Sequence, residues 1–182
     1  MPIIESALGI ERAFEIARSS ESVVAMAIGL EDFTADIGVP RSDDGKESLY
    51  ARCRLINAAK AAGIQPIDSV FSDIDDAEAL KNNVLLSKSL GFEGMGCIHP
   101  RQIPVIQKSF APGMEEIEKA AKIVTAYTEA GKNGTGVIVM GSKMIDLPVV
   151  KRAQKTLSLA VKMGIIPDSY IENEIASPGR KM

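Results

Sequence analysis

Val23-Val24-Ala25-Met26-Ala27-Ile28, followed by Gly29, is the stretch that decides the fold class. Its residues are all apolar, without the alternation of polar and apolar positions that a half-exposed strand shows. A continuous apolar run of this length suits a strand that is buried on both faces, as parallel sheets require. The stretch therefore predicts a parallel sheet covered by helices.

Strands and helices alternate on both sides of this run. Short apolar runs predict the other strands, at Ile3-Ile4, Pro66–Phe71 and Met95–Ile98. Apolar residues at helical spacing predict the helices between them, over 8–18, 47–62 and 77–90. Strands that alternate with helices of this length imply right-handed crossovers and a parallel sheet.

The four βα units leave two architectures open. A full β/α barrel has eight strands and roughly 250 residues, so this chain is either an open four-stranded sheet or the C-terminal half of a barrel. After the last strand, the pattern predicts helices over 102–109, 114–130 and 148–163, and a short hairpin near 134–141. We expect a partial barrel over 1–110, a C-terminal helical segment over 111–165 and a mobile polar tail over 166–182.

Composition excludes several classes of protein. The 182 residues are 46% hydrophobic and 25% charged, as in ordinary globular domains. The net charge of −3 gives no basic field for nucleic acid or anionic membranes. No apolar stretch approaches the ~20 residues of a spanning helix, and no signal peptide is recognisable, so we expect a cytoplasmic protein. Cys53 and Cys97 have no metal-ligand spacing and are expected to be free thiols.

Two carboxylates follow neighbouring strands directly. Glu5 ends the first strand, and Asp32 lies just after the second. Because ligands of parallel β/α folds bind at the carboxyl ends of the strands, both side chains are expected on one rim. Mg²⁺ is commonly held by one or two carboxylates and keeps places for water and substrate oxygens. The pair is therefore a candidate magnesium site, although a strand-end carboxylate often only caps the next helix.

The remaining polar residues support weaker hypotheses. Asp43-Asp44 and Asp75-Asp76 are interpreted as turn and helix-start residues. His99 is the one histidine of the chain, and it is either structural or a metal ligand or general base. Asp146 precedes Pro148 closely and is interpreted as a residue that interacts with the start of the following helix.

Short motifs at and between the strand ends narrow these alternatives. They are Ile4-Glu5-Ser6-Ala7-Leu8-Gly9-Ile10, Gly29-Leu30-Glu31-Asp32-Phe33, Leu49-Tyr50-Ala51-Arg52, Ile67-Asp68-Ser69-Val70-Phe71-Ser72-Asp73, Gly91-Phe92-Glu93-Gly94, Ile98-His99-Pro100-Arg101-Gln102-Ile103 and Gly141-Ser142-Lys143-Met144-Ile145-Asp146-Leu147-Pro148. In this order they resemble the citrate lyase β-subunit family, within the HpcH/HpaI-type aldolases and malyl-CoA lyases. Each motif alone is weak evidence for the family, but a chance match to all of them in the same order is improbable.

The resemblance implies a fold, a metal and site residues. The fold is α/β, the C-terminal half of a (β/α)8 TIM-type barrel followed by C-terminal helices. Glu5 and Asp32 carry over as the Mg²⁺ ligands, and Asp146 as the general acid/base, delivered in malyl-CoA lyase relatives from a neighbouring subunit. By the same resemblance, part of the wall of the site that receives the carrier arm of the thioester is formed by His99, Pro100 and Gln102. The segment that supplies the earlier barrel strands in the family lies before the part that matches Ile3.

The implied activity is that of a Mg²⁺-dependent carbon–carbon lyase of Claisen type. It would cleave a citryl thioester, on coenzyme A or an acyl carrier protein, into oxaloacetate and an acetyl thioester. The implied partners are further copies of the chain, in a trimer-like homo-oligomer, and other lyase subunits. Three alternatives stay open: a malyl- or citramalyl-CoA lyase or thioesterase on the same site, a non-catalytic subunit of a lyase complex, and an open four-stranded βα domain that binds another ligand.

Overall fold

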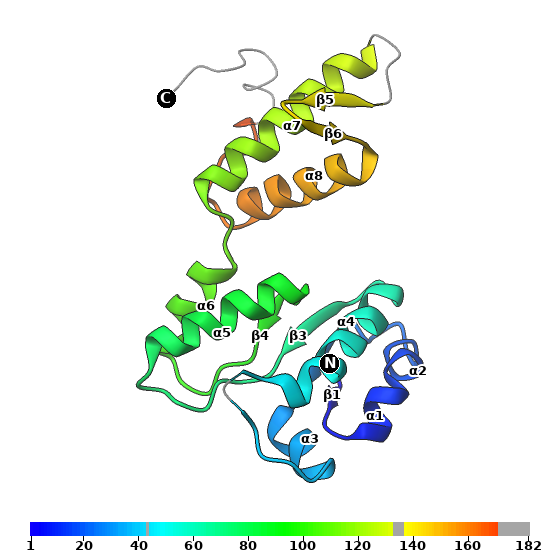
Figure 1. The fold of residues 1–182 in the computed structure, drawn as a ribbon, viewed down its shortest axis with the longest axis vertical. Helices are drawn as coiled ribbons and strands as arrows, with labels where there is room; N and C mark the ends of the chain where they lie inside the picture. Colours follow the sequence, from blue (N-terminus) through cyan, green and yellow to red (C-terminus); the bar gives the residue numbers. More distant parts are fainter. Residues whose placement is uncertain (43, 133–136, 171–182) are drawn as a thin grey trace. The chain divides into compact units, whose positions relative to one another are not determined.

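The computed structural model describes residues 1–42, 44–132 and 137–170. These residues form two compact units, Met1–Phe110 and Ala111–Met182 (Figure 1). Each unit has its own hydrophobic core, and each is described here by itself.

The first unit is a parallel sheet whose strands are joined by helices. Along the chain its elements are β1 (Ile3–Ile4), α1 (Ala7–Glu11), α2 (Ala13–Ala17), β2 (Ala25–Ile28), α3 (Leu30–Asp36), the 3-10 helix η1 (Lys46–Ser48), α4 (Leu49–Ala61), β3 (Gln65–Asp68), α5 (Ala77–Leu90), β4 (Gly94–Met95) and α6 (Gln102–Phe110). The sheet order is β1-β2-β3-β4, and every pair is parallel. The predicted parallel β/α fold is therefore confirmed.

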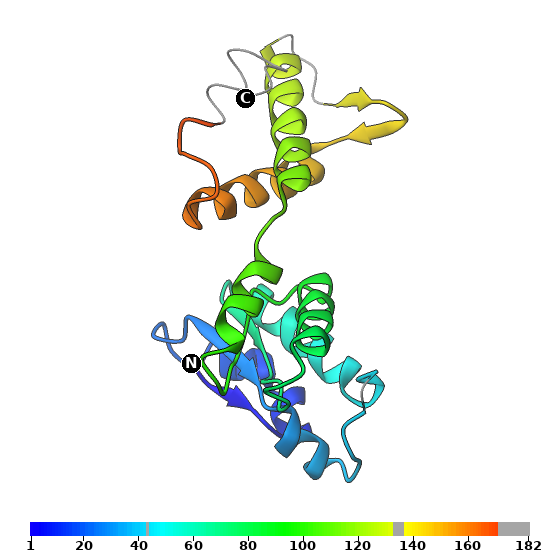
Figure 2. The same cartoon turned by 90° about the vertical axis from the view of Figure 1, so that its left-hand side faces the viewer.

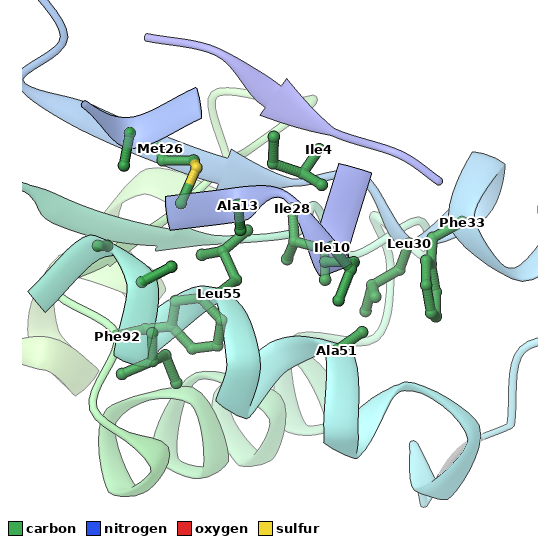
Figure 3. Packing of buried hydrophobic residues seen from close by; sticks show 14 residues of the cluster. Ile4, Ile10, Ala13, Met26, Ile28, Leu30, Phe33, Ala51, Leu55 and Phe92 are labelled. Carbon is green, nitrogen blue, oxygen red and sulfur yellow. The ribbon is translucent and has the colours of Figure 1, made fainter. Parts of the chain in front are cut away.

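The main core lies between one face of the sheet and helices α1, α2 and α4. Figure 3 shows Ile4, Met26 and Ile28 of the strands facing Ile10 and Leu55 of the helices. Each fully buried side chain of this size contributes about 1.5–3 kcal/mol relative to an exposed one. This packing fixes the face of each strand, because neighbouring residues of a strand point to opposite faces.

The sheet ends on both sides at a strand with a single partner. Within the described residues, β1 pairs only with β2, and β4 pairs only with β3. Ile3 alternates with the buried Ile4 and is 55% exposed on the other face. A sheet of this form has two open edges, which would be paired in a closed barrel.

Some predicted elements differ from those in the structure. The helix predicted over 8–18 is split at Arg12 into α1 and α2, since Arg12 leaves helical geometry at φ −98° and ψ 14°. The strands are shorter than predicted, and β4 comprises Gly94–Met95 only. Helix α3 was not predicted, because its seven residues are too few for a clear helical period.

The second unit packs two helices against a hairpin. Helix α7 (Met114–Lys132) is followed by strands β5 (Ile138–Met140) and β6 (Lys143–Ile145) and by helix α8 (Leu147–Lys162). The strands pair antiparallel, with Val139 opposite Met144, and Figure 2 shows this hairpin in yellow. The predicted hairpin near 134–141 is thus shifted towards the C-terminus, while residues 133–136 lie outside the described part.

The first residues of the expected mobile tail contact the core of the second unit. Ile166 and Tyr170 are 5% and 7% exposed and pack into the core of the second unit. Ile166 and Tyr170 are apolar side chains in a mainly polar stretch, and their burial explains why this part of the chain packs against the core. Residues 171–182 of the expected tail lie outside the described residues.

Two smaller expectations concern the cysteines and the membrane. Cys53 and Cys97 are free, as predicted. In the ranges that the structure describes, no helix is both long enough and apolar enough to cross a bilayer.

Candidate functional site

The carboxyl ends of β1, β2 and β3 bring three residues into one row. Ile4 pairs with Ile28, so Glu5 and Gly29 follow at neighbouring positions. Ser69 follows β3 in the same way beside Gly29, since Ala27 pairs with Ile67. The row of Glu5, Gly29 and Ser69 forms the rim on which ligands of parallel β/α folds bind.

Glu5 extends its side chain across Gly29. A Cβ atom built on Gly29 would lie 2.5 Å from Oε1 and 2.7 Å from Cγ of Glu5. The backbone of Gly29, at φ −106° and ψ 102°, is one that any residue can adopt. The glycine is therefore required for space: it lets the carboxylate of Glu5 lie against the end of β2, where α3 begins.

Asp32 lies in the first turn of α3 and is exposed. Leu30 and Phe33 of the same helix are 4% and 5% exposed and anchor it to the main core. Because these two residues fix one face of α3, Asp32 is held on the solvent side of the rim. The structure thus places both predicted metal ligands at the carboxyl end of the sheet, on neighbouring strand–helix junctions.

The two candidate ligands have free oxygens, unlike the carboxylates around them. In the part of the chain that the structure describes, neither Glu5 nor Asp32 has a hydrogen bond or an ion pair from another side chain. By contrast, Glu31 is paired with Arg41 at 2.7 Å, and Asp36 accepts a hydrogen bond from the amide of Ala7 at 2.8 Å. Glu5 and Asp32 thus differ from the paired carboxylates Glu31 and Asp36 in having oxygens free to bind a cation.

The donor set of this rim fits magnesium. Residues 1–42, 44–132 and 137–170 contain no group of three or more His, Cys, Asp or Glu side chains placed to hold a metal. Zinc sites need three or four such protein ligands, whereas Mg²⁺ is usually held by one or two carboxylates and completes its shell with water or substrate oxygens. Glu5 and Asp32 match the second pattern.

Asp44 and Asp76, one residue from each of the other acidic pairs, serve local structure as the sequence predicted. Asp76 caps α5 by accepting a hydrogen bond from the amide of Ala79 at 2.9 Å. The hydrogen bond from Lys46 to Asp44 lowers the pKa of that carboxyl below its usual range. Both carboxylates are exposed and bind within their own loop or helix end, so they are not candidates for the metal. Asp43 lies outside the described residues.

The loop after β4 is shaped by Gln102. This residue is 2% exposed; its Oε1 accepts from the amide of Ile98 at 3.0 Å, and its Nε2 donates to the carbonyl of Phe71 at 2.9 Å. Gln102 therefore ties the loop after β4 to the loop after β3. His99 is half-buried and accepts at Nδ1 from the amide of Arg101 at 3.2 Å, while Pro100 is exposed. Of the three residues predicted to line the wall for a thioester arm, Gln102 is buried and bonds to the loop that carries the other two.

Asp146 belongs to the second unit, where it begins helix α8. It has extended backbone geometry and accepts a hydrogen bond at Oδ1 from the amide of Val149 at 3.3 Å. Its side chain is partly exposed. The residue is thus a helix N-cap, as its position before Pro148 indicated. The cap uses Oδ1, and the second oxygen, Oδ2, has no partner among the described residues.

Sequence reasoning missed a buried ionic network behind the rim. Arg52 of α4 and Asp68 of β3 are 3% and 2% exposed and form an ion pair, and Asp68 also accepts a hydrogen bond from Ser87 of α5. The guanidinium of Arg52 lies 5.7 Å from the ring centroid of Phe92. An arginine among apolar residues of a helix and an aspartate at the end of an apolar strand were the available signals. Their pairing is set by tertiary structure.

A hollow of about 690 Å³ opens beside the rim. Its walls come from α5, the loop after β3 and the Glu31–Arg41 ion pair, and most of the lining residues are polar. The lining includes Glu31, the residue that precedes Asp32 in α3.

The chain is similar in sequence to known proteins. The chain is 44% identical over 174 residues, 94% of its length, to the citrate lyase subunit beta of Leuconostoc mesenteroides subsp. cremoris, of which it covers 58%. It is 34% identical over 171 residues to the human mitochondrial citramalyl-CoA lyase, covering 90% of this chain and 50% of that protein. The chain thus spans a little over half the length of the curated citrate lyase relatives that it matches.

A solved structure shares the fold as well. The protein CitE from Mycobacterium tuberculosis, in complex with magnesium, acetoacetate and coenzyme A, superposes with a TM-score of 0.76 at 32% identity. The match covers 87% of this chain and 59% of that one. The parallel β/α fold is therefore the TIM-barrel type of citrate lyase β subunits, as predicted. Residues 1–100 also match the family model of the HpcH/HpaI aldolase/citrate lyase family, and the chain belongs to that family.

Proposed function

We propose that this chain is part of a Mg²⁺-dependent carbon–carbon lyase of the citrate lyase β-subunit type. The substrate would be a citryl thioester, and the products oxaloacetate and an acetyl thioester. One observation carries the proposal: Glu5 and Asp32 lie on one rim with free oxygens, in a family whose relatives include citrate lyase β subunits. The magnesium, acetoacetate and coenzyme A in the CitE structure support the same chemistry.

Glu5 and Asp32 would hold the metal. A cation bound by two carboxylates keeps positions open for the carboxylate and carbonyl oxygens of an oxo acid, and it would supply electrophilic polarisation of that carbonyl. The role of the chain is to present both carboxylates with fixed backbones, Glu5 through β1 and Asp32 through α3. The free oxygens avoid the cost of breaking an existing hydrogen bond when the cation binds.

Asp146 would exchange a proton with the acetyl carbon. Bond cleavage leaves an enolate on the acetyl thioester, and a positioned carboxylic acid completes the reaction by protonating it. As the cap of α8, Asp146 is held in one conformation while its Oδ2 is free. We propose that it acts at the rim of a neighbouring copy in a trimer-like homo-oligomer. The loop with His99 and Pro100, held by Gln102, would receive the carrier arm.

A second candidate has its own support. The 34% identity to human citramalyl-CoA lyase favours a malyl- or citramalyl-CoA lyase or thioesterase with the same metal ligands. Such an enzyme differs in the groups that contact the substrate side chain, not in the metal chemistry. A third candidate, a non-catalytic subunit of a lyase complex, would keep the fold and lose turnover.

An assay of the full-length protein separates these candidates. Citryl and citramalyl thioesters are supplied with and without Mg²⁺, and the faster substrate identifies the enzyme. We expect Glu5→Gln and Asp32→Asn to reduce turnover by at least roughly a hundredfold. Glu31→Gln is the matched control, because that carboxylate is one residue away and already paired with Arg41. Metal-independent turnover, or full activity of the two variants, contradicts the proposal. Binding of Mg²⁺ without turnover of either substrate supports the non-catalytic subunit.

A further inference from the structure

Helix α3 begins without a cap from its own sequence. Its N-cap residue is Gly29, which has no side chain to accept from the first amides of the helix. With seven residues, Leu30–Asp36, the helix is too short to be stable without tertiary contacts. The position of its first turn, which carries Asp32, therefore depends on groups outside the helix.

Ser69 supplies the missing acceptor. Its Oγ accepts a hydrogen bond of 3.1 Å from the amide of Leu30, the first residue of α3. Ser69 and Leu30 are 6% and 4% exposed, so water does not replace this bond. The contact joins the carboxyl end of β3 to the start of the helix that follows β2.

Ser69 is itself held by the buried network. Its amide donates to Oδ1 of Asp68 at 2.9 Å, and Asp68 is fixed by Arg52 of α4 and by Ser87 of α5. A continuous set of buried polar contacts thus leads from the helix layer to the rim. The network fixes the backbone of Ser69 at the end of β3, and from there its hydroxyl oxygen reaches the amide of Leu30.

We propose that Ser69 is a positioning residue of the metal site: it fixes the first turn of α3 and through it the carboxylate of Asp32. The inference rests on the proposed function, in which Glu5 and Asp32 bind Mg²⁺. Ser69 does not contact the metal. Its effect passes through the backbone from Leu30 to Asp32, two residues further along the same turn.

The affinity for a divalent cation tests this role directly. Mn²⁺, which takes the same oxygen ligands and has an electron paramagnetic resonance signal, is titrated into the full-length protein and its variants. We expect Ser69→Ala to bind Mn²⁺ about tenfold more weakly, as is typical for loss of a group that orients a metal ligand. Ser69→Thr keeps the acceptor and should restore the affinity, whereas Ser69→Val has the same shape as threonine but lacks the hydroxyl and should not. The Thr and Val variants answer the question even where Ser69→Ala folds poorly.

The controls separate a local effect from a general one. Ser89→Ala removes another serine hydroxyl, one that is exposed on α5 and donates to the carbonyl of Leu86, and it should leave Mn²⁺ affinity unchanged. Circular dichroism at the titration temperature confirms that each variant is folded. If wild type binds Mn²⁺ and Ser69→Val binds within twofold of Ser69→Thr, the positioning role is disproved while the metal site stands. If wild type itself binds no Mn²⁺, the proposed function and this inference both fall.

Discussion

Gly29 shows how a single residue at the rim determines where a candidate metal ligand lies. In a Gly29→Ala variant, the new Cβ would approach Oε1 of Glu5 to 2.5 Å, so the Glu5 side chain must move. The move costs little folding free energy, because the Glu5 side chain is exposed and can turn into solvent, and the backbone of Gly29 accepts an alanine. We expect Mg²⁺ affinity, measured by calorimetric titration, to fall about tenfold while the melting temperature stays within a few degrees of wild type.

A second glycine provides the control for that experiment. Gly113→Ala places its Cβ in open space, with no atom within 4 Å, and should change neither quantity. Unchanged Mg²⁺ affinity of Gly29→Ala would mean that the carboxylate of Glu5 does not need its position across Gly29. A large fall in melting temperature would instead show that Gly29 is required for folding.

At the residue scale, the sequence predicted where single residues lie in the fold better than it predicted which side chains touch. Glu5 and Asp32 could be assigned to one rim because parallel strands bring their carboxyl ends together. The need for Gly29 could not be predicted, since it arises from the space that the Glu5 side chain takes up. The pairing of Arg52 with Asp68 is likewise a contact between distant parts of the chain, which periodicity does not detect.

At the element scale, Asp146 at the start of α8 combines a structural role, the helix cap, with the proposed chemical role. Asp146→Ala removes the cap and should destabilise the fold by about 1 kcal/mol, and it should also abolish turnover. Asp146→Ser keeps a capping oxygen but no acid, so it should retain near wild-type stability and still lack activity. Denaturant unfolding and turnover of the thioester, measured on both variants, separate the two roles.

The cap of α5 serves as the reference for this pair of variants. Asp76 caps that helix with a similar hydrogen bond, and it is exposed and far along the chain from the proposed acid. Asp76→Ala should cost a similar free energy of unfolding and leave the chemical step intact. Wild-type turnover by Asp146→Ser would remove Asp146 from the reaction.

The sequence predicted long elements more accurately than short ones. Helix α5 was predicted with the bounds that it has, Ala77–Leu90, because Asp76 caps it and Gly91 ends it with φ +112°. Helix α3 was not predicted, because its stability comes from buried contacts of Leu30 and Phe33 and from the hydroxyl of Ser69. Short helices of this kind are stabilised by tertiary contacts, and local helix propensity does not predict such contacts.

At the scale of the whole molecule, the described sheet has four strands and two open edges, and the proposed acid and the proposed metal ligands belong to separate units. In symmetric oligomers a site is often built from two copies, so each copy can supply what another lacks. The proposal that Asp146 serves a neighbouring copy therefore predicts complementation. A Glu5→Gln variant and an Asp146→Asn variant should each be inactive alone and regain activity when mixed.

The expected recovery follows from how the copies combine. A working site needs the intact rim of one variant beside the intact Asp146 of the other, and random mixing in a ring produces about a quarter of all sites in that form. The two full-length variants are therefore mixed, dissociated and reassembled, and turnover is compared with reassembled wild type. A mixture of Glu5→Gln with Asp32→Asn is the matched control, since both changes lie on one rim and no combination of copies restores it. Recovery near a quarter places the acid on a neighbouring copy. Absence of recovery from an assembled mixture places it on the same chain as the metal ligands, because a site within one chain cannot be repaired by another.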